Sequence, residues 1–516
     1  MNLLKTLAAI SSMTMLSRVT GLLRETLFAR AFGAGAYTDA FIVAFRIPNL
    51  LRRLFAEGAF SQAFVPILSE YKNQHGQEAS KTLADHVANT LVWSTLFVSA
   101  LGIIGAPLFV YLIATGLDKQ PGAFDAAVWM TRLMFPYISF MAFVAMAGGV
   151  LNTWREFKIP AFTPVLLNVS FIAASLFLQS HLEQPIYAMA IAVFVGGILQ
   201  VAIQIPALIK IGMLPRLSWN PAAGLGDPGV RRVLKKMGPA VFAVSAAQIS
   251  LMINTSIASR LAEGSISWLS YADRLMEFPT ALLGVALGTI LLPSLSKAKA
   301  DGDTQEYSDL LDWGLRLTFL LALPAAVGMA ALAKPLIATL FHYGKFTDEA
   351  ATQSSYPLIA YSAGLLGIIL VKTLAPAFYA RQDIRTPVRI AIGVLIATQL
   401  MNWIFVPYLK VSGLALSIGL GACINASFLY TGLRKRGIYN PKPGWPLFCA
   451  KLAVACALMG VAAWFGGQQV DWLAMQHHTL LRIGALMLLI GLCGAVYFAA
   501  LFAMGFRLRD VKRTAR

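Results

Sequence analysis

The sequence is poor in charge. Charged residues make up only 13% of the 516 residues, against roughly 25% in soluble domains, whereas hydrophobic residues make up 58%. Apolar windows of about 20 residues recur along the chain, and each is long enough to cross the apolar core of a bilayer. This composition excludes a soluble globular protein and predicts an all-α polytopic membrane protein.

Signatures of catalysis and metal binding are also missing. No glycine-rich phosphate loop ending in Gly-Lys-Ser/Thr is present, which excludes an ATP-driven pump on a single chain. The six histidines are scattered, and the adjacent His477 and His478 have no acidic or thiol partner at ligand spacing. The four cysteines lie in apolar segments without metal or redox spacing. We therefore predict no enzyme, no catalytic residue, no cofactor and no metal site.

The apolar windows predict fourteen membrane spans. The first two are the helices Ala8–Arg30 and Ala36–Ser69, which a glycine-rich turn joins. The others are expected at 84–113, 126–150, 160–179, 186–209, 238–260, 266–295, 309–333, 351–379, 387–407, 411–433, 445–466 and 481–506. The length of the second helix indicates a part outside the membrane or a kink at Pro48.

Basic residues are concentrated in the loops on one side of this topology. Most of the 42 lysine and arginine residues fall in the loops that share a side with the two termini. The opposite loops hold only Lys119, Arg260, Lys334, Lys345 and Lys410. By the positive-inside rule both termini are cytoplasmic. Topology then accounts for the net charge of +18, and no nucleic-acid partner is needed.

An internal repeat is visible when the chain is shifted by about 227 positions. Segment 66–69 aligns with 293–296, and segment 156–160 aligns with 383–387 at the same offset. The shift covers six helices, an even number, so both copies cross the membrane in the same sense. We therefore predict two parallel six-helix lobes around a central cationic cavity.

The repeat divides the chain into four parts. We predict an N-lobe at 1–214 with spans one to six, a cytoplasmic linker at 215–238, and a C-lobe at 239–436 with spans seven to twelve. The two extra C-terminal helices, spans thirteen and fourteen, and a basic cytoplasmic tail occupy 437–516.

Charged residues lie inside the first two spans. The first contains Arg18, Arg24 and Glu25, and the second contains Asp39, Arg46, Arg52, Arg53 and Glu57. One Arg at mid-membrane costs about 2.5–3.5 kcal/mol, so several of them facing lipid would not be tolerated. These side chains are therefore expected to surround a water-filled cavity.

Helical spacing brings several of these groups to one face. In the second span Asp39, Arg46 and Arg53 recur every seven residues, and Asn49 and Glu57 join them by steps of three and four. Arg53 and Glu57 are also spaced to form an ion pair.

Arg52 in the second span and Arg274 in the eighth span are two further charged candidates. Arg52 lies about 100° round from Arg53 on an ideal helix, so one of the two points elsewhere unless Pro48 bends the helix. The eighth span adds Arg274, with Asp273 nearby.

The charges have a structural and a functional interpretation. In the structural one they form ion pairs between helices or reach the membrane interface, as we expect for Arg30. In the functional one they contact a substrate. Cations outnumber carboxylates, which favours an anionic substrate, because guanidinium groups match diphosphate and carboxylate oxygens. The predicted substrate-binding residues are Arg18, Arg24, Arg46, Asn49, Arg52 and Arg274. The predicted gate or ion-pair residues are Glu25, Asp39, Arg53, Glu57 and Asp273.

With these residues in view, the chain resembles the MurJ/MviN lipid II flippases of the multidrug/oligosaccharidyl-lipid/polysaccharide exporter superfamily. The resemblance covers essentially the full length. Its most specific segments are Ser17-Arg18…Gly21…Arg24, Thr38-Asp39-Ala40-Phe41, Pro48-Asn49-Leu50-Leu51-Arg52-Arg53…Ala56-Glu57-Gly58-Ala59-Phe60, Leu151-Asn152-Thr153 and Tyr271-Ala272-Asp273-Arg274-Leu275. One departure is at Arg46, where some relatives carry Lys.

The resemblance implies a function. Members of this family move undecaprenyl-pyrophosphoryl-disaccharide-pentapeptide (lipid II) from the inner to the outer leaflet of the bacterial inner membrane for peptidoglycan synthesis. Their functional arginines correspond to Arg18, Arg24, Arg52 and Arg274, and spans thirteen and fourteen form a groove that takes the lipid tail. The expected partners are lipid II and the membrane, with the cell-wall synthesis machinery as a candidate.

Several alternatives stay open at this point. The driving force is the membrane potential or a cation gradient. A flippase for another polyprenyl-diphosphate glycan needs the same cationic chamber, and a membrane scaffold would bind the precursor without transporting it. A multidrug cation exporter would need an acidic or aromatic cavity, which the basic residues argue against.

Overall fold

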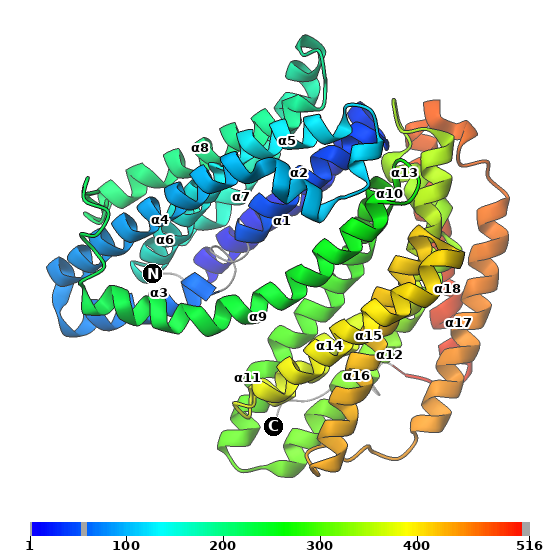
Figure 1. Ribbon diagram of the computed structural model, residues 1–516. Helices are drawn as coiled ribbons and strands as arrows, with labels where there is room; N and C mark the ends of the chain where they lie inside the picture. The colour runs from blue at the N-terminus through cyan, green and yellow to red at the C-terminus, as the bar shows by residue number, and fades with distance from the viewer. Residues whose placement is uncertain (1–2, 53–58, 508–516) are drawn as a thin grey trace. The chain divides into compact units, whose positions relative to one another are not determined.

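The computed structural model describes residues 3–52 and 59–507, and Figure 1 follows the chain through its helices. Helices joined by turns and loops make up this part of the chain, which confirms the predicted all-α fold. Two compact units are present: unit 1 is 1–266 with 344–346, and unit 2 is 267–343 with 347–516. Helix α9 thus groups with unit 1, and the division into lobes at 214 and 239 stays a prediction.

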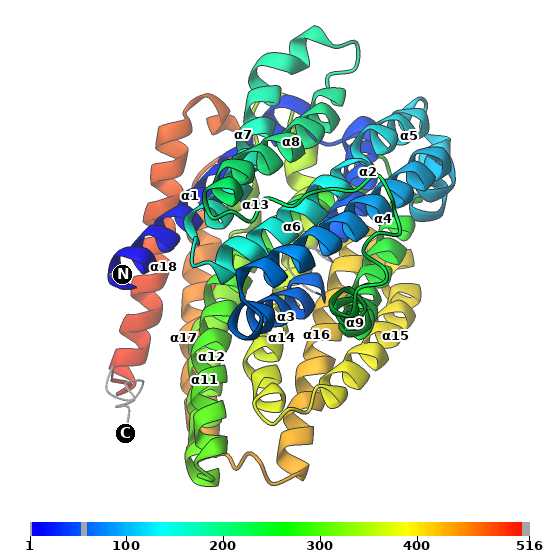
Figure 2. The same cartoon turned by 90° about the vertical axis from the view of Figure 1, so that its left-hand side faces the viewer.

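The helices of unit 1 follow the chain from its N-terminal side. They are α1 (Leu3–Phe32), α2 (Ala36–Arg52), α3 (Ala59–Gln74), α4 (Gly76–Ile113), η2 (Leu117–Lys119), α5 (Ala123–Met134), α6 (Tyr137–Thr153), α7 (Lys158–Ala173), η3 (Ala174–Leu178), η4 (Gln179–His181), α8 (Tyr187–Lys210) and α9 (Pro228–Ser259). Within this unit α3 lies beside α4 and α9 (Figure 2), and side chains from these helices, α6 and α8 form one apolar core.

Helix α10 (Ser265–Pro279) starts at the end of unit 1 and continues into unit 2. The other helices of unit 2 are η5 (Thr280–Val285), α11 (Ala286–Ala300), α12 (Thr304–Ala331), α13 (Ala333–Phe341), α14 (Asp348–Tyr379), α15 (Arg385–Leu409), α16 (Val411–Lys435), α17 (Trp445–Gln468), η6 (Ala474–His477) and α18 (Thr479–Ala503). One apolar core joins α11, α12, α14 and α16, and a second joins α12 to the paired helices α17 and α18 (Figure 1).

Ten helices of the described residues are long and apolar enough to cross a membrane. The predicted first, second, seventh and eighth spans, which correspond to α1, α2 with α3, α9, and α10 with α11, are not among them. Three of these four carry charged candidate residues, and α2 and α10, with 17 and 15 residues, are also shorter than the helices that qualify. The number of fourteen spans therefore stays a prediction.

Three predicted spans are interrupted. The helix expected at 126–150 is two helices, because the chain breaks at Phe135-Pro136, where proline removes a backbone donor. The helix expected at 266–295 changes into the π-helix η5 after Pro279. The helix expected at 160–179 changes into the π-helix η3 after Ala173. The helix expected at 36–69 is described as α2 and α3, and residues 53–58 lie outside the described residues.

The repeat is visible in the backbone as well as in the sequence. Arg155 and Gln382, which are about 227 positions apart, both adopt positive φ angles, of 65° and 59°. Such angles are uncommon for residues other than glycine. Each residue directly precedes its copy of the repeated segment, at 156–160 and 383–387. The two units therefore use the same strained turn at corresponding positions.

Ion pairs repeat at the same offset. In unit 1 Lys210 lies 3.6 Å from Glu156, and in unit 2 Arg436 lies 2.6 Å from Asp383. Each pair joins the end of its unit's α8 or α16 to the turn that begins α7 or α15. These contacts add structural support to the internal repeat seen in the sequence.

A third pair of contacts holds the segment that follows α8 in unit 1 and the segment that follows α16 in unit 2. The Arg216 N–H donates to Asp85 Oδ1 at 2.9 Å, and the Lys442 N–H donates to Asp312 Oδ1 at 3.1 Å. The two acceptors are about 227 positions apart, on α4 and α12. Helix α4 therefore holds the segment that follows α8, and helix α12 holds the segment that follows α16.

A buried cation lies where α13, α14 and α18 meet. Arg482 is 0% exposed; its Nη1 donates to the Trp472 carbonyl at 3.3 Å and its Nη2 to the His342 carbonyl at 3.1 Å. The guanidinium also stacks on Tyr343, 4.6 Å from the ring centre. His342 Nδ1 lies 3.4 Å from Arg482 Nη1, and His342 Nε2 lies 2.7 Å from Asp348. His342 thus stands between a buried cation and an exposed carboxylate.

We expect this histidine to make stability depend on pH. Burial lowers the pKa of His342 below its ordinary value of 6.5, and the charge of Arg482 adds to that effect against the opposing attraction of Asp348. The unfolded chain then binds a proton at His342 more readily than the folded chain, so stability is lost as the pH falls below 6.5 towards the folded-state pKa. Thermal unfolding of the purified protein between about pH 8 and pH 5.5 measures this loss. The His342→Gln variant should show a flatter dependence, and an equal slope in both proteins would contradict the assignment.

Candidate functional site

Arg24 is held at three sides in unit 1. Its Nη1 donates to Asn168 Oδ1 on α7 at 3.1 Å, and its Nη2 forms an ion pair with Glu25. The guanidinium carbon lies 5.1 Å from the ring centre of Phe171, one turn further along α7. The Arg24 side chain is still 18% exposed, so its cation is fixed in direction but not sealed from a ligand.

Phe171 connects this cation to α2. Its ring packs edge-on against Phe41 and Phe45, with ring centres 6.1 and 6.2 Å away. Phe41 also packs against Phe28 of α1 at 5.5 Å. The three helices therefore share an aromatic cluster beside the Arg24 guanidinium, and helix α2 continues from this cluster directly into Arg46.

Two candidate residues follow the cluster on α2. Arg46 comes directly after Phe45, and Asn49 lies three residues further on, on the same face of the helix. Both are partly buried and both have interactions within the described chain. Their spacing places a cation and an amide in adjacent turns of α2.

Asp39 takes part in a reciprocal contact at the start of α2. It is 1% exposed, and its Oδ2 accepts the Gly264 N–H at 3.0 Å. In return Glu263 Oε1 accepts the Ala36 N–H at 3.0 Å. We call these four residues the carboxylate latch. Each carboxylate accepts a backbone N–H at or next to the N-terminus of a helix, α2 or α10, where anions are favoured.

Unit 2 contains the candidates of α10. Arg274 is exposed, and its Nη1 lies 3.2 Å from Glu277 Oε2, with side-chain exposures of 39% and 46%. A pair this exposed contributes little to stability. Asp273, its neighbour in sequence, is partly buried. The π-helix η5 follows this turn, and such segments are frequent at functional sites.

The structure gives fewer contacts, or none, for the remaining candidates. Arg18 is exposed on α1. Arg52 is the last residue of α2, and its side chain is outside the described part of the structure. Arg53 and Glu57 lie outside the described residues altogether. The substrate or gate role of each candidate stays a prediction.

Three residues that contact the candidates were missed by sequence reasoning, namely Asn168, Phe171 and Glu263. Asn168 and Phe171 lie on α7, an apolar helix without charge after Lys158, and they surround Arg24. An amide in the middle of an apolar helix is itself a signal, because an unpaired amide in the membrane is costly. Glu263 was missed because it lies in a short loop, where an exposed carboxylate is common.

Solved structures of other proteins have the same fold as this chain. A chain titled "Lipid II flippase MurJ, inward closed conformation" matches with a TM-score of 0.78 at 24% identity, over 96% of this chain and 99% of that chain. A multidrug resistance MATE family transporter of the MOP superfamily, in an inward-facing conformation, matches with a TM-score of 0.66 at 14% identity, over 84% and 98% of the two chains. The chain therefore has the fold that these two solved structures share.

Sequence comparison identifies the family. The family described as "Lipid II flippase MurJ" matches residues 28–483. A "Lipid II flippase MurJ" of Burkholderia cenocepacia is 57% identical over 100% of both chains. A "Probable lipid II flippase MurJ" of Vibrio cholerae serotype O1 is 42% identical over 99% of this chain and 98% of its own. The chain belongs to the lipid II flippase MurJ family, which confirms the resemblance seen in the sequence.

Proposed function

We propose that this protein translocates lipid II from the inner to the outer leaflet of the bacterial cytoplasmic membrane for peptidoglycan synthesis. One observation carries the proposal, namely 57% identity over the whole of both chains to a curated relative named as a lipid II flippase. Transport by this route moves the headgroup across the membrane without breaking a covalent bond, so no enzymatic step is part of the proposal.

The cationic residues suit the headgroup of this substrate. Lipid II carries a diphosphate and peptide carboxylates, and Arg24 offers a partly exposed guanidinium whose direction is fixed by Asn168 and Phe171. Arg18, Arg46, Asn49, Arg52 and Arg274 are the further proposed substrate contacts. Hydrogen bonds between charged partners are roughly twice as strong as neutral ones, which favours an arginine-lined path.

We further propose that the chain forms two parallel six-helix lobes around a central cationic cavity. The repeated turns and ion pairs of the two units support the six-helix repeat behind this arrangement. Rocking of one lobe against the other would open the cavity to each leaflet in turn. The carboxylate latch is the proposed gate at one end of this cycle, with Glu25, Arg53, Glu57 and Asp273 as further gate or ion-pair candidates.

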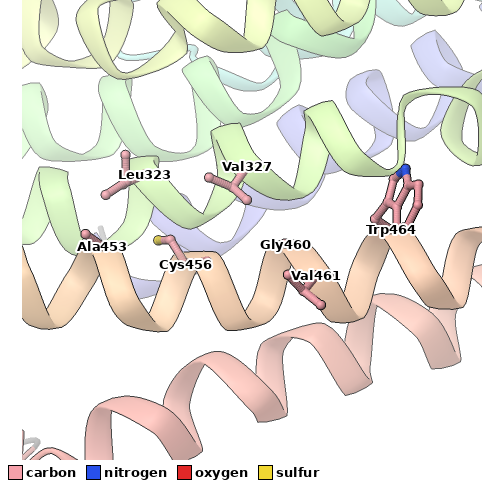
Figure 3. A pocket seen from close by; sticks show the side chains of 8 residues that line it. Leu323, Val327, Ala453, Cys456, Gly460, Val461 and Trp464 are labelled. Carbon is pink, nitrogen blue, oxygen red and sulfur yellow. The ribbon is translucent and has the colours of Figure 1, made fainter.

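An apolar groove in unit 2 is the proposed site of the lipid tail. It has a volume of about 570 Å³ and lies between α12 and α17 (Figure 3), so it shares only α17 with the groove predicted at spans thirteen and fourteen. Its lining is free of charged side chains and consists of Leu323, Val327, Ala453, Cys456, Ala457, Gly460, Val461 and Trp464. A polyprenyl chain is apolar throughout, so a groove of this lining would hold a segment of it next to surrounding lipid.

The remaining features of the proposal concern topology and energy. We propose that both termini are cytoplasmic, because the positive-inside rule assigns the basic loops to that side. The driving force is the membrane potential, worth about 2.3 kcal/mol per elementary charge per 100 mV, or a cation gradient. Proteins of cell-wall synthesis are the candidate partners.

The test is rescue of a bacterium depleted of its own lipid II flippase. The unmodified chain should restore growth and export of lipid II, whereas Arg18→Ala, Arg24→Ala, Arg52→Ala and Arg274→Ala should each leave lipid II in the inner leaflet. Arg30→Ala is the matched control, because Arg30 lies on the same helix as Arg24 and contributes only its backbone carbonyl to a described hydrogen bond, from the Lys345 N–H. Normal export in all four variants, at normal membrane levels, would refute the cationic site. If the unmodified chain fails to restore growth and lipid II export, the proposal that lipid II is its substrate would be refuted.

A further inference from the structure

The amide of Asn168 is saturated by helix α1. Its Nδ2 donates to the Ser17 carbonyl and to Thr20 Oγ1, both at 3.1 Å, and its Oδ1 accepts from Arg24 at 3.1 Å. Ser17, Thr20 and Arg24 lie on one face of α1, at steps of three and four residues. One side chain of α7 therefore touches three successive positions of the helix that carries the candidate arginine.

The chemistry fixes which way this amide points. Arg24 can only donate, so the atom that faces it must be the amide oxygen. The Ser17 carbonyl can only accept, so it must face the amide nitrogen. Asn168 is 7% exposed and buried against α1, so water does not compete for these bonds. The orientation of the amide is thus determined from both ends.

Saturation of Asn168 restricts Arg24. The guanidinium has five donors; one binds Asn168, one pairs with Glu25, and the face lies over Phe171. A free arginine would sample many rotamers, and an arginine that is bound on one edge and one face presents its remaining donors in a single direction. Binding a diphosphate to such a group loses less conformational entropy.

We infer that Asn168 is a positioning residue for lipid II translocation, which acts by aiming the Arg24 guanidinium at the substrate's anionic headgroup. The inference rests on the proposed function of Arg24. Asn168 itself touches no substrate in this scheme, because both ends of its amide are occupied by α1. Its removal should therefore weaken substrate binding only while Arg24 is present.

A double-mutant cycle on the full-length protein tests this dependence. The affinity of fluorescent lipid II is measured for wild type, Asn168→Ala, Arg24→Ala and the double variant, each reconstituted in nanodiscs. We expect Asn168→Ala to weaken binding about tenfold, as for loss of a hydrogen bond to a charged group. We expect Arg24→Ala to weaken it at least as much, and the double variant to equal Arg24→Ala.

Asn89 provides a matched control. It is also a buried amide, 2% exposed, with its Nδ2 on the Asn220 carbonyl and its Oδ1 on the Ser218 N–H, and it touches no arginine in these bonds. Asn89→Ala should lower thermal stability and leave lipid II affinity unchanged.

Asn168→Asp replaces Asn168→Ala in the cycle if Asn168→Ala fails to fold, since aspartate keeps the size of the asparagine side chain. Its carboxylate would neutralise Arg24, and we expect the salt dependence of binding to fall with the affinity.

The outcomes separate the two claims. The positioning role would be overturned if the fold-loss of lipid II affinity in the double variant equals the product of the two single losses. It would also be overturned if folded Asn168→Ala and Asn168→Asp bind lipid II with unchanged affinity. Either result would leave Arg24 as a substrate contact. Unchanged affinity in Arg24→Ala would instead overturn the proposed role of the arginine, and the role of Asn168 with it.

Discussion

Replacing Gly364 by valine is expected to abolish the accumulation of folded protein in the membrane. Gly364 of α14 lies against Gly419 of α16, and a Cβ at Gly364 would fall well inside the van der Waals radius of the Gly419 backbone. One turn along, a Cβ at Gly367 would lie 2.6 Å from the Cys423 nitrogen. The two helix backbones therefore meet directly through small residues, as is common between membrane helices.

The cost follows from the absence of room. The obstructing atoms belong to a backbone, so no side chain can rotate away, and the helices must separate along the whole contact. Overpacking of this kind costs about 1–3 kcal/mol for a methylene and more for a β-branched side chain. The measurement is the yield of monodisperse protein by fluorescence-detected size exclusion, together with its thermal midpoint.

Gly393→Val on α15 is the matched control. A Cβ at Gly393 meets nothing within 4 Å, and this residue lies on a helix that also packs against α16. We expect wild-type yield from this variant. Equal yields from Gly364→Val and Gly393→Val would show that the close approach of α14 and α16 is not needed for folding.

Replacing Asp39 by alanine is expected to reduce lipid II export strongly while leaving the protein folded. The change removes the acceptor of the Gly264 N–H and leaves a buried donor unpaired, at a cost of about 1–3 kcal/mol. If the carboxylate latch is a gate, that cost falls only on the state in which the latch is closed. A shift of this size changes the ratio of two conformations about 5- to 150-fold.

Cysteine labelling reads the state of the latch. Ser265 is 0% exposed, and its hydroxyl makes no hydrogen bond within the described part of the chain, so Ser265→Cys is a mild change. In a background without the four native cysteines, an impermeant maleimide should label Cys at this position faster in Asp39→Ala than in wild type. Asp39→Asn keeps an oxygen acceptor for Gly264 and should behave closer to wild type. Slow labelling and normal export in Asp39→Ala would remove Asp39 from the gate.

The sequence was sufficient for the broad architecture because the membrane restricts the choice. A single apolar segment that crosses a bilayer can pair all of its backbone N–H and C=O groups only by forming a helix. The helices of the ten apolar spans could therefore be placed from composition. The interruptions of these helices were harder to predict from the sequence. The break before Tyr137 follows from Pro136, whereas the change to a π-helix at Thr280 depends on packing that no local pattern encodes.

The candidate site was predictable only in its charges. Arg24 and Asp39 are conspicuous because charge in an apolar helix is costly. Their partners are distant in sequence: Arg24 meets Asn168, and Asp39 meets the backbone of Gly264. Spacing along a single helix cannot reveal such contacts, and a neutral amide or a glycine N–H carries no charge to attract notice.

The repeated ion pairs have a consequence for the history of the chain. A turn with a positive φ angle, and a pair that joins it to the last helix of its copy, occur at Glu156 with Lys210 and again at Asp383 with Arg436. Two copies that arose by duplication inherit such contacts together, whereas independent invention would have to find the same turn and the same partners twice. The contact therefore predates the duplication. On this account the turn and its ion pair were already present in a half-length ancestor of the chain.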